Sequence, residues 1–405
     1  MSAAWQSKPW VKRFRALATL VITCVVGAVI GHFLEPLMKN IEAKDLYVAV
    51  IMSPNSPLSS VSKKFLEGLH AKENGRSFLS GANGIKVPIV EFDDLDNVVD
   101  AERYAQKLLN DQNCVLVIGN SSSTLTAVSL DVFMRQSQTA PSLIMPIATA
   151  DELLIRAKAA GYDAILRMPP PDKDQAELIV KLALKVGTAS AARKGQGSRQ
   201  QVALYGDGAN SVYSSNLLRL VAEKSRARGI GVLTEDLLGV QHSIYSSLAA
   251  WNKLAAPSVV IYLGNTHQAL LLCDQLRGLG KTMPIVFSDG CMTEEMLQYM
   301  RTFPNECFIT SPLSLKGING KGEERALTYQ PYGEDAFVLI EKILQSVPSV
   351  SRAEIAHYIQ SKRPEIVLRD GAAGSYRFSE DGNNADIRFH GYRITGGKLK
   401  QYDIE

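Results

Sequence analysis

Cysteine, histidine and an excess of either charge are all scarce in this chain of 405 residues. Its five cysteines are too few for a disulfide framework. The six histidines are scattered, without HExxH or paired metal spacing, so we expect no metal and no cofactor. Basic residues barely outnumber acidic ones, 44 to 41, and no basic stripe is interleaved with aromatics. This balance argues against nucleic-acid binding.

Motifs for phosphate binding and nucleophilic catalysis are also missing. Residues 278–282 read GLGKT, but Gln275 stands where a P-loop needs its first glycine, so a glycine ending a helix is the better interpretation. Residues 119–123 read GNSSS and lack the second glycine of a nucleophile elbow. Asp93 and Asp94 could form a carboxylate pair, although a solvated loop at a strand end is the simpler reading. We therefore predict no catalytic residues and no enzyme.

Residues 1–44 hold a long apolar run that predicts a signal or a membrane anchor. Four basic residues precede a stretch without charge from Ala16 to Leu34, just long enough to cross ~30 Å of hydrocarbon as a helix. This order favours an uncleaved anchor with the rest of the protein across the membrane. A signal peptide cleaved near Gly27-Ala28 is the alternative, and a lipid anchor on Cys24 is a third.

The other cysteines fall into two groups. Cys114 opens an apolar run and Cys273 lies on an apolar helix face, so both are expected in the core. Cys291 and Cys307 could pair in an oxidising compartment. The sequence leaves this pairing open.

From residue 45 onward, short apolar β-branched runs alternate with amphipathic stretches. The runs predict strands at 45–52, 85–94, 114–119, 142–148, 163–168, 201–206, 231–238, 258–264, 283–289 and 306–312. The stretches predict helices at 59–74, 97–112, 124–136, 214–228, 244–254 and 268–279. This alternation, with strands apolar throughout, predicts an α/β protein with two successive doubly wound units.

Two further segments carry local signals. Residues 187–200 are rich in Gly, Ser, Ala and basic side chains, which predicts an exposed loop. Residues 375–404 alternate in polarity around Asp-Gly and Gly-Gly pairs, which predicts a closing antiparallel ribbon.

Residues 115–124 read VLVIGNSSST, a strand followed by four hydroxyls where the next helix begins. Such a loop offers hydroxyls, backbone N–H groups and the positive end of a helix dipole together. This combination suits an anion of the size of a carboxylate. Helix capping is the simpler alternative, but one serine would satisfy it.

Several segments in order resemble one protein family. They are 91–133, 144–153 (IMPIATADEL), 164–176 (AILRMPPPDKDQA), 202–218, 261–280, 283–290 (MPIVFSDG), 331–344 and 376–394. Their order and spacing are similar to those of the periplasmic binding proteins of the leucine/isoleucine/valine type. The resemblance covers nearly all of residues 45–405.

The resemblance implies a type 1 periplasmic binding fold, with two Rossmann-like α/β lobes joined by three hinge crossings. The crossings are expected near 166–170, 308–312 and 371–376. Lobe 1 would comprise 45–166 and 310–373, and lobe 2 would comprise 167–309 and 374–405. A small ligand is then expected between the lobes.

The resemblance also implies a carboxylate site. Family members that bind amino acids hold the carboxylate with a serine after the third strand and a threonine of an "AT" pair. These positions correspond to Ser123, with Ser122 as a close alternative, and to Thr149. Backbone N–H groups of Ile147 and Thr149 are expected nearby.

The ligand's ammonium group is expected on the second lobe. Asp289 in FSDG matches the family's acid, and Tyr213 matches its aromatic residue. Asn265 stands where some relatives carry a tyrosine, which leaves the ligand's side chain undefined.

The function implied by the resemblance is an extracytoplasmic solute-binding protein. It would capture an amino acid or analogue by hinge closure and deliver it to an ABC transporter permease. A membrane-tethered sensor of the same fold, without a transport role, is the alternative.

Overall fold

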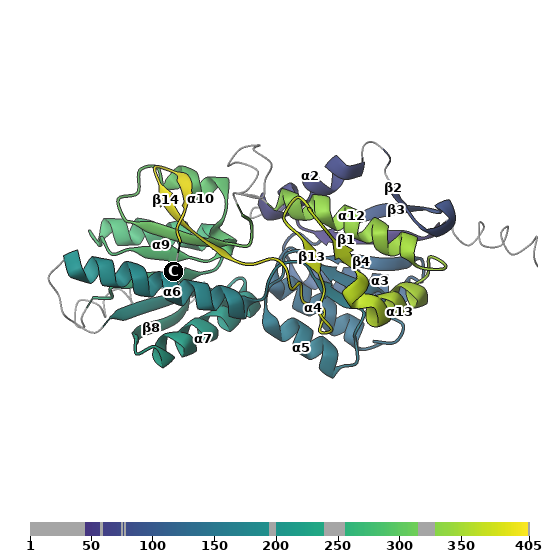
Figure 1. The fold of residues 1–405 in the computed structure, drawn as a ribbon, viewed down its shortest axis with the longest axis horizontal. Helices are drawn as coiled ribbons and strands as arrows, with labels where there is room; N and C mark the ends of the chain where they lie inside the picture. Colours follow the sequence, from purple (N-terminus) through teal and green to yellow (C-terminus); the bar gives the residue numbers. More distant parts are fainter. Residues whose placement is uncertain are drawn as a thin grey trace, which may run out of the picture. The chain divides into compact units, whose positions relative to one another are not determined.

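The computed structural model describes residues 45–403 apart from 57–59, 74–75, 77, 194–199, 239–255 and 315–328. The predicted N-terminal anchor and the helix predicted at 244–254 lie outside these residues. In the described part of the chain, no helix is both long and apolar enough to cross a membrane. The strands form two large sheets and a short ribbon (Figure 1).

The first sheet has the strand order β2-β3-β1-β4-β5-β6. Its strands are β1 (Tyr47–Met52), β2 (Phe78–Ser80), β3 (Lys86–Asp93), β4 (Cys114–Gly119), β5 (Ser142–Met145) and β6 (Ile165–Arg167). Strand β2 runs antiparallel to β3, and the other neighbours are parallel. Central strands such as β4 are buried along their whole length because both faces of the sheet are covered.

Helices cover both faces of the first sheet. One face packs against α3 (Val98–Asn110), α4 (Ser123–Met134) and α5 (Asp151–Ala159). The other face carries α2 (Ser60–Glu73), α12 (Gln330–Ser346) and α13 (Arg352–Lys362). Figure 1 shows that α12 and α13 come from a late part of the chain, so this half of the molecule is built from two segments.

The second sheet has the order β15-β14-β11-β10-β9-β7-β8. Its strands are β7 (Gln201–Asp207), β8 (Gly231–Leu238), β9 (Val259–Leu263), β10 (Ile285–Phe287), β11 (Cys307–Ser311), β14 (His390–Thr395) and β15 (Lys398–Gln401). Strands β7 to β11 are parallel, whereas β14 and β15 form an antiparallel hairpin. Gly396 and Gly397 form its turn with φ of 57° and 74°, a conformation that glycine adopts without strain. The predicted closing ribbon is thereby confirmed.

The second sheet is also covered on both faces. One face packs against α6 (Asp172–Arg193) and α7 (Ser211–Ala227). The other packs against α9 (Thr266–Gly278), the short η3 turn (Asp289–Cys291) and α10 (Glu294–Tyr299). Helix α9 ends as predicted, and Gly280 beyond it has φ of 61°.

The loop predicted at 187–200 is wrong for its first half. Helix α6 continues through residues 187–193 to Arg193. The stretch contains three alanines and an arginine, which are strong helix formers and outweigh its single glycine. Composition alone did not separate a helix end from a loop.

The chain passes between the sheets three times. The first passage leads from β6 to α6, and the second follows β11. The third lies later than the predicted 371–376, because residues 372–376 bond to Asp335 of α12, and Asn383 bonds to Arg167 at the end of β6. The passage therefore falls between 384 and the start of β14 at 390, the long yellow segment in Figure 1. The remaining lobe boundaries stay predictions.

Short elements precede this third passage. The η4 turn (Arg363–Glu365) follows α13, and β12 (Val367–Leu368) pairs with β13 (Tyr376–Arg377) in an antiparallel ribbon. Much earlier in the chain, in the first sheet, an η2 turn (Ala82–Gly84) joins β2 to β3.

Three expectations about side chains can be compared with the structure. Cys114 and Cys273 are fully buried core residues, as predicted. Cys291 and Cys307, whose pairing was left open, are both free thiols in the core beneath α9 and α10. The solvated reading of Asp94 is wrong, because its carboxylate is fully buried and accepts hydrogen bonds from Ser53 and Asn120.

Candidate binding cleft

The seven predicted ligand residues line one pocket. They follow the carboxyl ends of parallel strands, where neighbouring loops of a doubly wound sheet converge. The residues are Ser122, Ser123, Ile147 and Thr149 from the first sheet, and Tyr213, Asn265 and Asp289 from the second. Ser121, Asn210, Val61, Gly290 and Tyr329 complete the lining. The structure therefore brings together the seven predicted residues, although their contact with a ligand remains a prediction.

The four hydroxyls after β4 have four different partners. Ser122 is the N-cap of α4, and its Oγ accepts a hydrogen bond of 3.2 Å from the Leu125 N–H. Ser121 Oγ lies 2.9 Å from Ser53 Oγ. Thr124 Oγ1 lies 3.1 Å from Asn210 Oδ1, beside the start of α7. One serine does the capping, as the simpler reading proposed, and the other hydroxyls bond elsewhere.

Ser123 joins the two loops expected to hold a carboxylate. Ser123 is only 2% exposed, and its Oγ accepts a long hydrogen bond of 3.4 Å from the Ala150 N–H. Its own N–H is among the first of α4, where a helix provides no internal acceptor. The N–H groups of Ile147 and Thr149 lie in the facing loop, outside β5 and α5. Ser123, Ile147 and Thr149 all line the pocket, and we expect their donors to form the end that receives a carboxylate.

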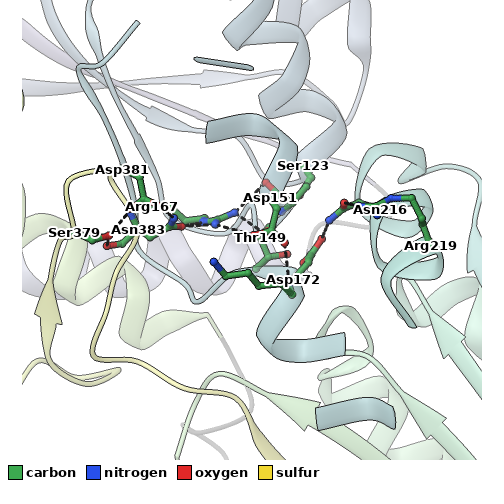
Figure 2. Close-up of polar contacts among 12 residues, drawn as sticks. Ser123, Thr149, Asp151, Arg167, Asp172, Asn216, Arg219, Ser379, Asp381 and Asn383 are labelled. Atoms are coloured by element: carbon green, nitrogen blue, oxygen red, sulfur yellow. Dashed lines mark hydrogen bonds and ion pairs between the residues drawn. The ribbon is translucent and has the colours of Figure 1, made fainter. Parts of the chain in front are cut away.

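Buried Arg167 fixes the loop that contains Thr149. Its Nη1 donates to the carbonyl oxygens of Thr149 at 2.7 Å and Ala150 at 3.0 Å. Its Nε donates to Asn383 Oδ1 at 2.9 Å, and Nη2 lies 3.5 Å from an Asp151 oxygen. Figure 2 shows Arg167 between the Thr149 loop and the Asn383 segment. A guanidinium group suits this position because its several donors point in fixed directions.

Asp172 lies on the other side of Thr149, at the first residue of α6. Its N–H donates to the Thr149 carbonyl at 3.0 Å, and its Oδ2 accepts from Asn216 Nδ2 at 2.8 Å. Figure 2 places Asp172 between Thr149 and Asn216 of α7. Burial raises the pKa of Asp172 to about 7, against the opposing effect of hydrogen bonds from Thr149 and Asn216.

Asp289 lines the pocket from the second sheet, where we expect the end that receives an ammonium group. Its Oδ1 accepts hydrogen bonds from Tyr213 Oη at 2.6 Å and Gln175 Nε2 at 2.8 Å. Its Oδ2 lies 3.3 Å from Tyr329 Oη. Burial raises the pKa of Asp289, while these three neutral donors oppose the rise. Among the described residues, no Lys, Arg or His forms an ion pair with Asp289.

Asn265 and Ile147 shape the wall between the two ends. The Asn265 N–H donates to Asp207 Oδ2 at 3.3 Å, at the start of α9. Ile147 is 8% exposed and lines the pocket from the first sheet. Both residues line the pocket, and the backbone of Asn265 is fixed by its hydrogen bond to Asp207.

Sequence reasoning missed several residues of the pocket. Gln175 and Tyr329 contact Asp289 but lie on or before helices, where no strand-end pattern marks them. Gln175 lies within one of the segments that carried the family resemblance, so this signal was present but unused. Asp172 and Arg167 lie in the same segment. In the described part of the chain, no three His, Cys, Asp or Glu residues are grouped as metal ligands.

Curated proteins similar in sequence to this chain include Leu/Ile/Val-binding proteins. No family model matches the chain. A curated Leu/Ile/Val-binding protein of Escherichia coli is 24% identical over 305 residues, which cover 75% of this chain and 72% of that protein. A second, from Citrobacter freundii, is 24% identical over 336 residues, 80% of this chain and 86% of that one.

Solved structures share the fold. A leucine-binding protein from Thermotoga maritima matches with a TM-score of 0.71 and 18% identity over 88% of this chain and 98% of that chain. A branched-chain amino acid transporter substrate-binding protein from Streptococcus pneumoniae, in complex with isoleucine, gives 0.68 and 18% over 89% and 99%. The resemblance found in the sequence is confirmed, and the fold is the type 1 periplasmic binding fold with two doubly wound lobes.

Proposed function

We propose that the protein is an extracytoplasmic solute-binding protein that captures an amino acid or close analogue between its lobes. The observation that carries this proposal is the pairing of Asp289 with neutral donors alone at one end of a pocket. A buried carboxylate without a cation is costly, and a ligand ammonium group would compensate it. The role is binding, as in the relatives, whose names describe binding proteins.

The second end of the pocket supports the same ligand class. Ser123 and the N–H groups of the Thr149 loop would receive the ligand's carboxylate. Amino acids carry their ammonium and carboxylate groups on one carbon, so a pocket with opposite ends fixes their orientation. Charge-assisted hydrogen bonds at both ends would also reject molecules that lack either group.

Closure of the lobes would complete the site, since each lobe supplies only one end. Thr124 already bridges them, because its Oγ1 also accepts a hydrogen bond of 3.1 Å from the Val212 N–H of α7. Ligand-driven closure about the three passages is hinge motion. The closed protein would then deliver its ligand to an ABC transporter permease, a role consistent with the isoleucine-bound neighbour, which is a transporter substrate-binding protein. An N-terminal anchor would hold the protein at the outer face of the membrane.

A thermal-shift and calorimetric screen tests the proposal. The panel contains the standard amino acids and their amides. It also contains the corresponding amines, which lack the carboxylate, and the corresponding acids, which lack the ammonium group. A true ligand at 100 times its Kd should stabilise the protein by about 2.7 kcal/mol. Asp289→Asn should abolish that shift, and Asp274→Asn, at an exposed surface ion pair, should preserve it. If no compound binds, or binding survives Asp289→Asn, the proposal is wrong.

A further inference from the structure

The Asp289 pocket continues into a second, strongly polar pocket. Ser121, Ser122, Asn265, Gly290 and Val61 line both. Six serines and two threonines line the second pocket, and Val61 is its one aliphatic side chain among the described residues. Since an amino acid held at both ends of the first pocket must direct its side chain onward, this neighbouring space is available to it.

The serines of this pocket form a chain of hydrogen bonds with a fixed direction. Ser53 Oγ donates its proton to the buried carboxylate of Asp94. Ser53 Oγ is therefore an acceptor for Ser121 Oγ, which lies 2.9 Å away and must donate in this pair. Ser121 consequently has no proton left for the cleft. Its remaining lone pairs accept, so its preferred partner on a ligand is an N–H or O–H donor.

The charges that line the second pocket are mainly negative. Asp96 lines it from the first lobe and Glu295 from the second. No Lys or Arg lines this pocket or the Asp289 pocket among the described residues, and His267 is the one basic side chain there. An uncharged aliphatic side chain would remove these acceptors from water without replacing their hydrogen bonds.

Further carboxylates stand behind Asp96. Burial and the nearby carboxylates of Asp94 and Asp207 raise the pKa of Asp96. Asp207 belongs to the second sheet, so carboxylates from both lobes approach one another here. None of the three forms an ion pair with a described Lys or Arg. A cation between the lobes would relieve this repulsion as they close.

We infer that the second pocket receives the ligand's side chain, and that this side chain ends in a cationic group with several N–H donors, an amine or a guanidinium. This inference rests on the proposed function and specifies its ligand class. It sets this chain apart from proteins that bind branched aliphatic amino acids. The acceptor-only Ser121 and the acids Asp96 and Glu295 are the groups that would select such a ligand.

Isothermal titration calorimetry of the full chain with lysine, ornithine, arginine, glutamine, leucine and isoleucine tests the inference. We expect at least one basic amino acid to bind about tenfold or more tightly than leucine, from the charge-assisted bonds. Asp96→Asn combined with Glu295→Gln should reduce that preference about tenfold, with the melting temperature retained because both residues keep part of their surface in solvent and neither is in an ion pair with a described Lys or Arg. Asp100→Asn, on α3 close to Asp96 but outside the pocket, is the control and should leave the preference unchanged.

The outcomes separate the inference from the proposed function. Tightest binding of leucine or isoleucine, lost in Asp289→Asn, would overturn the inference and leave the amino-acid site intact. A basic preference that the double variant does not reduce would also overturn it. Absence of binding by every amino acid would overturn both. Ser121→Ala should weaken a basic ligand and glutamine alike, since both offer N–H donors, whereas the double variant should weaken only the basic ligand.

Discussion

The hydroxyl of Tyr213 lies 2.6 Å from Oδ1 of Asp289 and joins the first turn of α7 to the loop after β10. Two elements far apart in the sequence therefore present one acceptor to the cleft. Gln175 adds a second donor to the same oxygen, which leaves Oδ2 as the less saturated one. The carboxylate is held in one orientation before any ligand arrives.

Tyr213→Phe should weaken the ligand about tenfold, near the lower limit of the roughly 1.5–3 kcal/mol that a hydrogen bond to a charged group contributes, because Gln175 still orients Asp289. Calorimetric titration measures the change. Tyr299→Phe is a matched control, because Tyr299 also lies 2.6 Å from a carboxylate, that of Asp274, outside the cleft. Equal losses in the two variants would contradict the assignment of Tyr213 to the site.

Ser122 and Ser123 should respond differently to replacement by alanine. Ser122→Ala removes the N-cap of α4 and should lower the free energy of unfolding by about 1 kcal/mol. Ser123→Ala removes a long hydrogen bond and should instead weaken the ligand about fivefold or more. Urea unfolding and calorimetry separate these effects. Ser129→Ala on the same helix, where the hydroxyl has no described partner, should change neither. If Ser122→Ala weakened the ligand and Ser123→Ala lowered the free energy of unfolding instead, the roles of the two serines would be exchanged.

Arg167→Gln should lower the free energy of unfolding by about 3–5 kcal/mol, because it leaves buried carbonyl groups and Asp151 without their partner. Ligand binding should fall as well, because the Thr149 loop loses its support. Denaturant unfolding and titration at 10 °C would measure both, at a temperature where the variant is still folded. Arg156→Gln, at a half-exposed ion pair with Asp131, should change little. A stable Arg167→Gln protein would show that the guanidinium group is dispensable.

Asp172 should make stability depend on pH. Its pKa rises from 3.8 in the unfolded chain to about 7 when folded, so the folded state binds more protons between these values. The contribution of Asp172 is therefore complete below pH 3.8 and is lost as pH rises through about 7. Urea unfolding of Asp172→Asn at pH 5 and pH 8 should show a smaller difference than the natural protein, whereas Asp131→Asn should not. An unchanged difference in Asp172→Asn would mean that another group titrates.

The strands and the pocket were predictable for a common reason. Runs such as 114–119 are apolar throughout because both sheet faces are covered, and this pattern is readable without tertiary knowledge. Parallel strands bring their following loops to one edge, which accounts for Ser123 and Thr149 lying together on the first sheet. The assignment of Asp289, on the second sheet, to the same site came from the family resemblance. The family resemblance supplied the identity of each residue.

What the sequence did not reveal depends on packing. Gln175 contacts Asp289 because of how α6 is rotated about its own axis, and the hydrophobic periodicity of the sequence does not specify this rotation. Asp94 reads as a solvated strand end, yet Ser53 and Asn120 come from other strand ends to bury it. The third passage was placed too early because residues 372–376 look like a linker, although Asp335 binds them to α12. Each error concerns a partner distant in the chain.

Arg167 also has a mechanical consequence. It ends β6, where the first passage begins, and it bonds to Asn383, just before the third. Two of the three connections are thereby clamped to each other at one point, so they must bend as a single pivot and twist very little against each other. A substitution at Asn383, which does not itself line the pocket, should therefore alter how fast the cleft opens and releases a ligand.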